Sequence, residues 1–317
     1  MDVPIEGVEI REIPPEEAFS ILGNELRMEI LRALWEAGEP CPFSELRRQV
    51  APEDRGNFSY HLGKLTGHFV RKTDEGYALR FAGEQVVRAA LTGTITSDPK
   101  IPSTETDERC LYCGTRVRME YDEEVLSVRC PTCGGVIGDP FPDGTCMHFE
   151  FPPAGLEGRE HEEIIYAAHV LYDSKISPMM KGVCPECAGR IDISFDCCPD
   201  HEMREDTLCP NCNMRYEVFA RFECEHCLYG RQFPPWYAAL NHPAVVAFYY
   251  RHGLEEKIPF RKITWDNERF MRDVTSTVAG TNPYRFRVVV PIDDEQLVVT
   301  LDDRLDVLQV EKDQVDG

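Results

Sequence analysis

The cysteines are the residues whose spacing predicts chemistry most directly. The chain has 317 residues with 14 Cys, and eleven of these, together with one His, form pairs separated by two residues. Thiolates are soft ligands, and two such pairs flanking strand-like sequence supply the four ligands of a tetrahedral zinc site. The expected ligands are Cys110, Cys113, Cys130, Cys133, Cys184, Cys187, Cys198, His201, Cys209, Cys212, Cys224 and Cys227. These twelve ligands predict three closed, structural zinc sites, and iron is the alternative metal that four thiolates leave open.

The pairing of the last eight ligands follows from an apparent internal repeat. Two units, 184–201 and 209–227, each begin with Cys-Pro-x-Cys, continue with a strand and close with a second pair. We expect each unit to close its own metal site, while an interleaved pairing, in which the first pairs of the two units join, is left open. Cys197 is an alternative to Cys198, which we prefer because two residues separate it from His201.

No pattern typical of catalysis accompanies these ligands, so we expect that the chain is not an enzyme. Closed metal sites stabilise folding, whereas catalytic zinc keeps an open position. The sequence contains no His-Glu-x-x-His motif and no phosphate-binding glycine loop. Cys41, Cys146 and Cys197 remain outside the ligand set, and they supply the alternative of a thiol-redox-responsive regulator.

Residues 1–95 have the element order of a winged helix-turn-helix. Apolar residues recur at helical spacing in four segments, a hairpin with its turn at 74–76 follows, and Gly83 to Leu91 forms a last helix. Asp54 is the expected N-cap of the fourth helix, whose buried stripe is Phe58, Leu62 and Leu65. In this fold the fourth helix enters the major groove of DNA and the hairpin flanks the backbone.

The polar face of the fourth helix and the hairpin are the predicted DNA contacts. Arg and Asn suit base edges, while Lys and Tyr suit phosphates. The residues expected on this surface are Arg55, Asn57, Tyr60, His61, Lys64, Arg71, Lys72 and Arg80. The window 55–72 contains four Lys or Arg and no acid, so this surface is cationic although the whole chain is acidic.

The N-terminal sequence resembles the ArsR-type winged-helix transcription regulators. Phe19 to Leu34 is similar to the N-terminal segment of that family. The recognition helix of its haloarchaeal members resembles the segment Asn57-Phe58-Ser59-Tyr60-His61-Leu62-Gly63-Lys64-Leu65. The similarity continues into the Cys-rich half. The resemblance implies a dimeric, promoter-binding regulator in which Ser59, Tyr60 and His61 contact DNA and the helix 83–91 forms the dimer. Metal-sensing members carry a Cys pair on the third helix, which is absent from 44–50 here, so sensing of toxic metals by that route is not expected.

Composition indicates a halophilic, cytoplasmic protein. The net charge is -22, from 34 Lys and Arg against 56 Asp and Glu, and only eight of the cations are Lys. Concentrated salt screens the self-repulsion of such a surface, and there counterion release contributes little, so DNA affinity should fall only shallowly as salt rises. The acidic start, Met1 to Glu6, lacks a signal-peptide pattern, and no apolar run is long enough for a membrane helix.

We therefore expect an α+β chain with a winged helix-turn-helix at 1–95, a linker at 96–109, a zinc ribbon at 110–138 and a mixed C-terminal domain at 139–317. The last contains the two repeat units, a helix over 160–171 with His161 and His169 at its surface, and a β-rich tail. The predicted function is a sequence-specific transcription regulator that binds double-stranded DNA as a homodimer. Its C-terminal region would bind a protein partner or small effector, or hold the dimer. The competing hypothesis is a zinc-stabilised adaptor of the transcription machinery.

Overall fold

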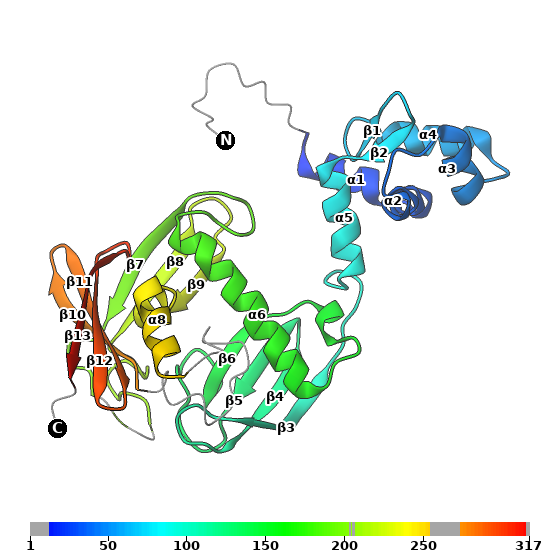
Figure 1. Cartoon of the computed structure of the whole chain (residues 1–317). Helices are drawn as coiled ribbons and strands as arrows, with labels where there is room; N and C mark the ends of the chain where they lie inside the picture. Colours follow the sequence, from blue (N-terminus) through cyan, green and yellow to red (C-terminus); the bar gives the residue numbers. More distant parts are fainter. Residues whose placement is uncertain (1–12, 203, 205–206, 254–272, 315–317) are drawn as a thin grey trace. The chain divides into compact units, whose positions relative to one another are not determined.

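The structure is a computed structural model that describes residues 13–202, 204, 207–253 and 273–314. It is a mixed α+β chain that divides into an N-terminal unit, Met1–Ser97, and a C-terminal unit, Asp98–Gly317 (Figure 1). The acidic start of the chain, where the sequence lacks a signal-peptide pattern, lies outside the described residues. None of the helices in the described ranges has the length and apolar character needed to cross a membrane.

The N-terminal unit contains the elements that its sequence predicts. They are α1 (Pro15–Leu22), α2 (Glu25–Ala37), α3 (Phe43–Val50), α4 (Arg55–Leu65), β1 (Val70–Lys72), β2 (Tyr77–Leu79) and α5 (Phe81–Leu91). The Asn24 side chain accepts the Arg27 N–H at the start of α2, and Gly38 ends that helix with a φ of 67°, a left-handed conformation that suits glycine. The Asp54 carboxylate caps α4 as expected, because it accepts the Asn57 N–H at 2.9 Å.

A single apolar core holds the N-terminal unit together. The fully buried side chains include Ile30 and Leu31 of α2, Leu46 of α3, and Phe58 and Leu65 of α4. The helix α2 contacts α3, α4, α5 and β2, so it is the central element of the unit. This packing fixes which face of α4 is turned outward.

The first part of the C-terminal unit is a four-stranded antiparallel sheet in the order β3-β4-β5-β6, with α6 alongside it (Figure 1). Its elements are β3 (Ile101–Arg109), β4 (Arg116–Asp122), β5 (Val125–Arg129), β6 (Thr145–Glu150), the 3-10 turn Pro153–Leu156 and α6 (His161–Met180). The hairpin β4–β5 was predicted as a zinc ribbon in its own domain. It instead lies in the middle of this sheet, because β3 and β6 pair with its two outer edges.

The segment predicted as a linker is in part a strand. Residues 101–109 form β3, which pairs with β4 through Thr104↔Met119 and Glu105↔Arg118. The expectation of a linker is wrong here because β3 is an edge strand with one neighbour, and only Thr106 along it is buried. An edge strand can carry charges and a proline such as Pro102, so its sequence shows no apolar alternation.

Two further antiparallel sheets complete the C-terminal unit. The elements are β7 (Ile191–Cys197), β8 (Val218–Cys224), β9 (Gly230–Phe233), α7 (Trp236–Leu240), α8 (Pro243–Arg251), β10 (Thr275–Thr281), β11 (Tyr284–Ile292), β12 (Glu295–Leu301) and β13 (Val307–Gln314). The sheets have the orders β7-β8-β9 and β10-β11-β12-β13. They share an apolar core that includes Phe222, Phe248, Tyr249 and Phe286. The predicted β-rich tail is therefore the four-stranded sheet of β10 to β13.

Candidate metal centres and nucleic-acid interface

Four of the Cys pairs sit on the same backbone turn. In each, the N–H of the first Cys donates to the carbonyl five residues later, and the N–H four residues later donates back to the first Cys. At Cys110 these bonds are 2.8 Å to Thr115 and 2.9 Å from Gly114. The residues equivalent to Gly114 in the turns that begin at Cys184, Cys209 and Cys224 also have positive φ. Each turn points two side chains to the same side, which prepares half of a four-ligand site.

The first cluster consists of Cys110, Cys113, Cys130 and Cys133. Its four sulfur atoms lie within 4.8 Å of one another, with Cys110 Sγ 3.5 Å from Cys133 Sγ and Cys113 Sγ 3.4 Å from Cys130 Sγ. One pair lies between β3 and β4, and the other follows β5. Because β4 and β5 are antiparallel neighbours, the two pairs meet at one end of the hairpin. The sequence-based assignment of these four ligands to one site is confirmed by this geometry.

The remaining eight ligands form two clusters, but the predicted sequential pairing is wrong. The second cluster contains Cys184, Cys187, Cys224 and Cys227, and the third contains Cys198, His201, Cys209 and Cys212. The interleaved alternative is also wrong, so 184–201 and 209–227 are not independent repeat units. The reason is that β7 and β8 form one antiparallel pair, and each of its two ends brings together one Cys pair from either strand.

Hydrogen bonds orient the ligand atoms of the second and third clusters. In the second cluster the sulfurs of Cys184 and Cys227 lie 3.6 Å apart. In the third, His201 Nδ1 lies 3.5 Å from Cys212 Sγ, while its Nε2 lies 3.2 Å from the Arg215 carbonyl. A proton on Nε2 that donates to this carbonyl leaves Nδ1 free as a metal ligand, which is a common support for histidine ligands.

One thiol in each cluster is favoured as a thiolate, the form that binds metal ions. The pKa of Cys224 falls to about 6, chiefly because the N–H groups of Cys227 and His226 donate to its sulfur. Burial opposes ionisation of Cys209, but several main-chain N–H groups outweigh it and lower its pKa to about 7. The same balance, with Thr115 as donor, lowers the pKa of Cys113 to about 7. Among the described residues, the three clusters are thus positioned and charged to hold metal ions.

The three other thiols lie outside the clusters. Cys198, rather than Cys197, is the ligand in the third cluster, as the spacing to His201 predicted. Burial raises the pKa of both Cys41 and Cys197, which disfavours a reactive thiolate at either position. Cys146 is half-buried and contacts the Gly144 carbonyl at 3.5 Å.

The face of α4 that sequence predicts as a DNA surface is turned to solvent. Phe58, Leu62 and Leu65 are buried beneath it. Eight of the nine predicted contact residues are exposed: Arg55, Asn57, Ser59, Tyr60 and Lys64 on α4, and Arg71, Lys72 and Arg80 on or next to the hairpin. Lys64 Nζ lies 5.7 Å from the centre of the Tyr60 ring, and the Arg80 guanidinium donates to the Gly67 carbonyl.

His61 differs from the expectation of an outward-facing side chain. It is half-buried, and its Nδ1 has no hydrogen-bond partner in the structure. Burial, and then the nearby Arg27, lowers its pKa, so the ring is neutral near pH 7. The reason is its position next to Leu62, at the border between the buried stripe and the outer face. A single helical wheel does not separate border positions from outer ones.

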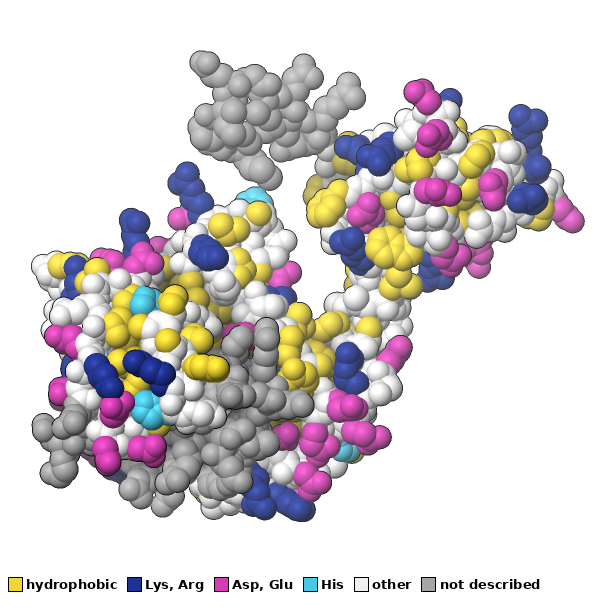
Figure 2. Space-filling view, in the orientation of Figure 1, with side chains coloured by type: hydrophobic (Ala, Val, Ile, Leu, Met, Phe, Trp, Pro, Cys, Tyr) yellow, Lys and Arg dark blue, Asp and Glu magenta, His cyan; other side chains and the backbone are white. Residues whose placement is uncertain are grey.

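The acidic residues are concentrated elsewhere. Among residues 55–72 there is no Asp or Glu, although the whole chain has a net charge of -22. Figure 2 shows many acidic side chains (magenta) over the side of the C-terminal unit that contains β3 and β4. Salt bridges such as Arg116–Asp107, 3.0 Å, and Lys100–Asp122, 2.6 Å, engage cations on that side. The outer face of α4 has no such carboxylate partner among the described residues.

Comparison with known protein families gives matches over both units. The family model of a domain of unknown function, DUF7351, matches residues 107–307. The chain belongs to this family. The DUF7351 segment contains all three metal-ligand clusters, and a second domain of unknown function, DUF7347, matches residues 15–90, which contain α1 to α4, the hairpin and all of α5 except its last residue. No curated protein and no solved structure matches the chain.

Proposed function

We propose that this DUF7351 protein is a sequence-specific transcription regulator of the ArsR-like winged helix-turn-helix type, which binds double-stranded promoter DNA through α4 and the β1–β2 hairpin. The observation that carries the proposal is the outer face of α4, which is exposed, lacks carboxylates and is supported by a fully buried stripe. Arg55 and Asn57 at the first turn of α4 would read base edges. Lys64, Arg71 and Lys72 would bind phosphates on either side.

The proposal includes zinc in all three clusters. The third cluster combines three Cys with one His, which is a set typical of structural zinc and unlike the four cysteines of common iron–sulfur clusters. Four protein ligands leave no open position for water, so the metal would stabilise the fold and the chain would not be an enzyme. Reduced thiols are needed for these sites, which supports a cytoplasmic location in the halophilic host that the composition indicates.

The proposed regulator is a homodimer. Large apolar side chains are exposed on the N-terminal unit: Phe19 on α1, and Phe81, Leu91 and Ile95 on or after α5, each with more than half of its surface accessible. Monomeric proteins rarely leave several large apolar residues open in one unit without a partner. A second copy of the chain on α1 and α5 would cover them and would present two α4 helices to a two-fold symmetric operator.

A genome-wide occupancy map of the full-length chain tests the function. We expect discrete peaks that share a sequence motif, and we expect Tyr60→Ala to remove them. Tyr250→Ala, which truncates an exposed tyrosine of α8, is the matched control and should leave the peaks in place. A map without discrete peaks overturns the regulator and favours the adaptor. Peaks that survive Tyr60→Ala show that α4 is not the reading element.

A further inference from the structure

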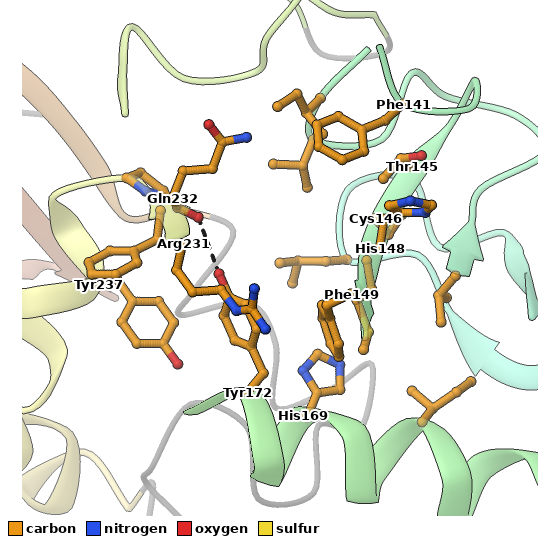
Figure 3. Close-up of a pocket in the computed structure, with 18 of the residues that line it drawn as sticks. Phe141, Thr145, Cys146, His148, Phe149, His169, Tyr172, Arg231, Gln232 and Tyr237 are labelled. Carbon is orange, nitrogen blue, oxygen red and sulfur yellow. Dashed lines mark hydrogen bonds between the residues drawn. The ribbon is translucent and has the colours of Figure 1, made fainter. Parts of the chain in front are cut away.

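A large cavity lies inside the C-terminal unit, away from the metal-ligand sulfurs of the second and third clusters. Its volume is about 1010 Å³ (Figure 3), and its lining includes residues of β6, α6, β8, β9 and α7 together with Cys110 and Tyr112 of the first metal-binding turn. Pockets for organic ligands usually measure about 300 to 1,000 Å³ and are mostly apolar with a few polar groups. This cavity has the size of such a pocket, and neither the metal clusters nor the DNA surface accounts for it.

Flat aromatic side chains form the walls and are held in place by the protein. Phe149 stacks on Tyr172 with ring centres 4.7 Å apart. The Tyr172 hydroxyl donates to the Gln232 carbonyl at 3.1 Å, and the Tyr237 hydroxyl donates to the Asp173 carboxylate at 2.6 Å. Because their hydroxyls are already bonded, these rings offer fixed flat faces, which lowers the ordering cost of binding a planar molecule.

Eight charged side chains line the cavity, five Glu and three Arg, and six of them have a hydrogen-bond or ion-pair partner within the protein. Arg231, whose side chain is only 13% exposed, pairs with Glu150 at 3.1 Å and lies over the Tyr172 ring. Burial lowers the pKa of His169 to about 4, so this imidazole is neutral at pH 7, yet it retains accessible surface because it borders the cavity. The pKa of His148 is also lowered, by burial and then by Arg129. An anion inside would therefore lose hydration without finding an unpaired cation. A cation would meet Glu108, whose pKa is raised by burial and then by Glu162, and Glu223, which is exposed and solvated.

Two neutral polar groups lie on opposite walls, His148 on β6 and Gln232 on β9 (Figure 3). The Ser127 hydroxyl lies 2.8 Å from His148 Nδ1, which leaves the other ring nitrogen, Nε2, to the cavity. The Gln232 side chain supplies both a donor and an acceptor. Together these groups can orient a ligand through hydrogen bonds that carry no net charge.

We propose that this cavity binds one uncharged, planar organic molecule, with its ring system against Phe149 and Tyr172 and its polar groups on His148 and Gln232. The site would be separate from the second and third clusters and from the DNA surface, and it would border the first cluster, because Cys110 is part of its lining. In the proposed regulator it would be the effector site, a role that rests on the proposed function. The binding itself does not depend on that function.

Fluorescence titration of the full-length chain with Nile red, an uncharged planar dye, tests the binding in the absence of DNA. We expect saturation at one dye per chain and displacement by naphthalene compounds. Among three compounds with the same ring system, the neutral methyl ketone should displace the dye at a concentration at least about tenfold lower than the carboxylate or the methylammonium, because a buried unpaired charge costs more than ~1.4 kcal/mol.

Two variants connect the dye to this cavity. His148→Trp should fill one wall and weaken dye binding at least about tenfold, with His161→Trp on α6, outside the lining, as the matched control. Gln232→Leu removes the amide with little change in size and should lower the affinity for the methyl ketone about two- to tenfold. Gln309→Leu, at an exposed glutamine, should leave that affinity unchanged. Metal content equal to that of the wild type confirms that each variant is folded.

Three results overturn the proposal: no saturable dye binding, equal displacement by the charged compounds, or binding that neither lining variant weakens. Because no DNA is present, each leaves the outcome of the occupancy map unaffected. Conversely, an empty occupancy map combined with variant-sensitive dye binding would remove the regulator and keep the ligand site. The two proposals therefore fail independently.

Discussion

Ile191 lies directly opposite Cys224 in the antiparallel register of β7 and β8, and Cys197 lies opposite Val218. The residues before β7 therefore meet those after β8, and the residues after β7 meet those before β8. One hairpin thus carries a metal-ligand cluster at each end. The register decides which Cys pairs share a metal, and the order of the pairs along the chain does not.

Paired cysteine variants distinguish this arrangement from sequential pairing. Cys187→Ser with Cys224→Ser damages only the second cluster, so the purified double variant should retain two metal ions per chain. Cys187→Ser with Cys198→Ser damages two clusters and should retain one. Elemental analysis of the folded proteins gives the ratio. Sequential pairing predicts the reverse order, and a wild-type ratio other than three would contradict the three-site arrangement.

Contacts to bases and contacts to phosphates should respond differently to mutation. Asn57→Ala is expected to reduce the binding free energy for the preferred operator by about 1–3 kcal/mol. It should also relax the preference for one base at one position of the site. Lys72→Ala should lower the affinity for all DNA sequences alike and reduce the salt dependence of binding. Binding titrations against an operator and its single-base variants measure both effects. A uniform loss of affinity with Asn57→Ala would place this side chain on the backbone instead.

Two helical glycines of the N-terminal unit should respond oppositely to alanine. A Cβ at Gly63 meets nothing within 4 Å, so Gly63→Ala should raise the free energy of unfolding by about 0.5–1 kcal/mol through helix propensity. A Cβ at Gly83 would lie 2.3 Å from the Phe69 carbonyl oxygen, so Gly83→Ala should lower it by about 1–3 kcal/mol. Calorimetry of the full chain gives both shifts. Equal effects would mean that α5 does not pack against Phe69 as described.

The buried imidazole of His169 should make the C-terminal unit less stable in mild acid. Its pKa is about 4 when folded against an ordinary value of 6.5, so the unfolded chain takes up a proton first as pH falls. Stability that is present above pH 6.5 is lost towards pH 4, by about 2 kcal/mol between pH 7 and pH 5. Denaturant unfolding of His169→Gln should show this slope reduced, while His161→Gln should match the wild type. An unchanged slope in His169→Gln would assign the acid sensitivity to other groups.

The features that sequence predicts well are those set by neighbouring residues. The Asp54 cap and the first cluster both depend on short spacings, and both are present in the structure. Each of the two Cys-rich units was also expected to contain a strand, and β7 and β8 are those strands. The pairing of these two strands with each other was not predicted, because the repeated Cys-Pro-x-Cys motif favoured two independent units over one hairpin.

The features that sequence missed depend on distant contacts. The strand β3 carries no alternating pattern, since a single neighbour and one buried side chain suffice to hold it. His169 was expected at the surface because nothing around it in sequence marks the cavity. The lining of that cavity includes residues of β6, α6, β8, β9 and α7, which are distant in sequence, so no local signal could have shown it.

The turn that carries the third cluster is also bonded to the loop behind the first. The Gly138 N–H donates to the Asn213 carbonyl at 2.9 Å, and the Arg215 N–H donates to the Val136 carbonyl at the same distance. These bonds join the two metal-binding turns into one backbone assembly, so an ion bound at one turn would stiffen the backbone around the other. Loading of these two clusters should therefore be cooperative, and by thermodynamic reciprocity each ion should raise the affinity for its neighbour by the same factor.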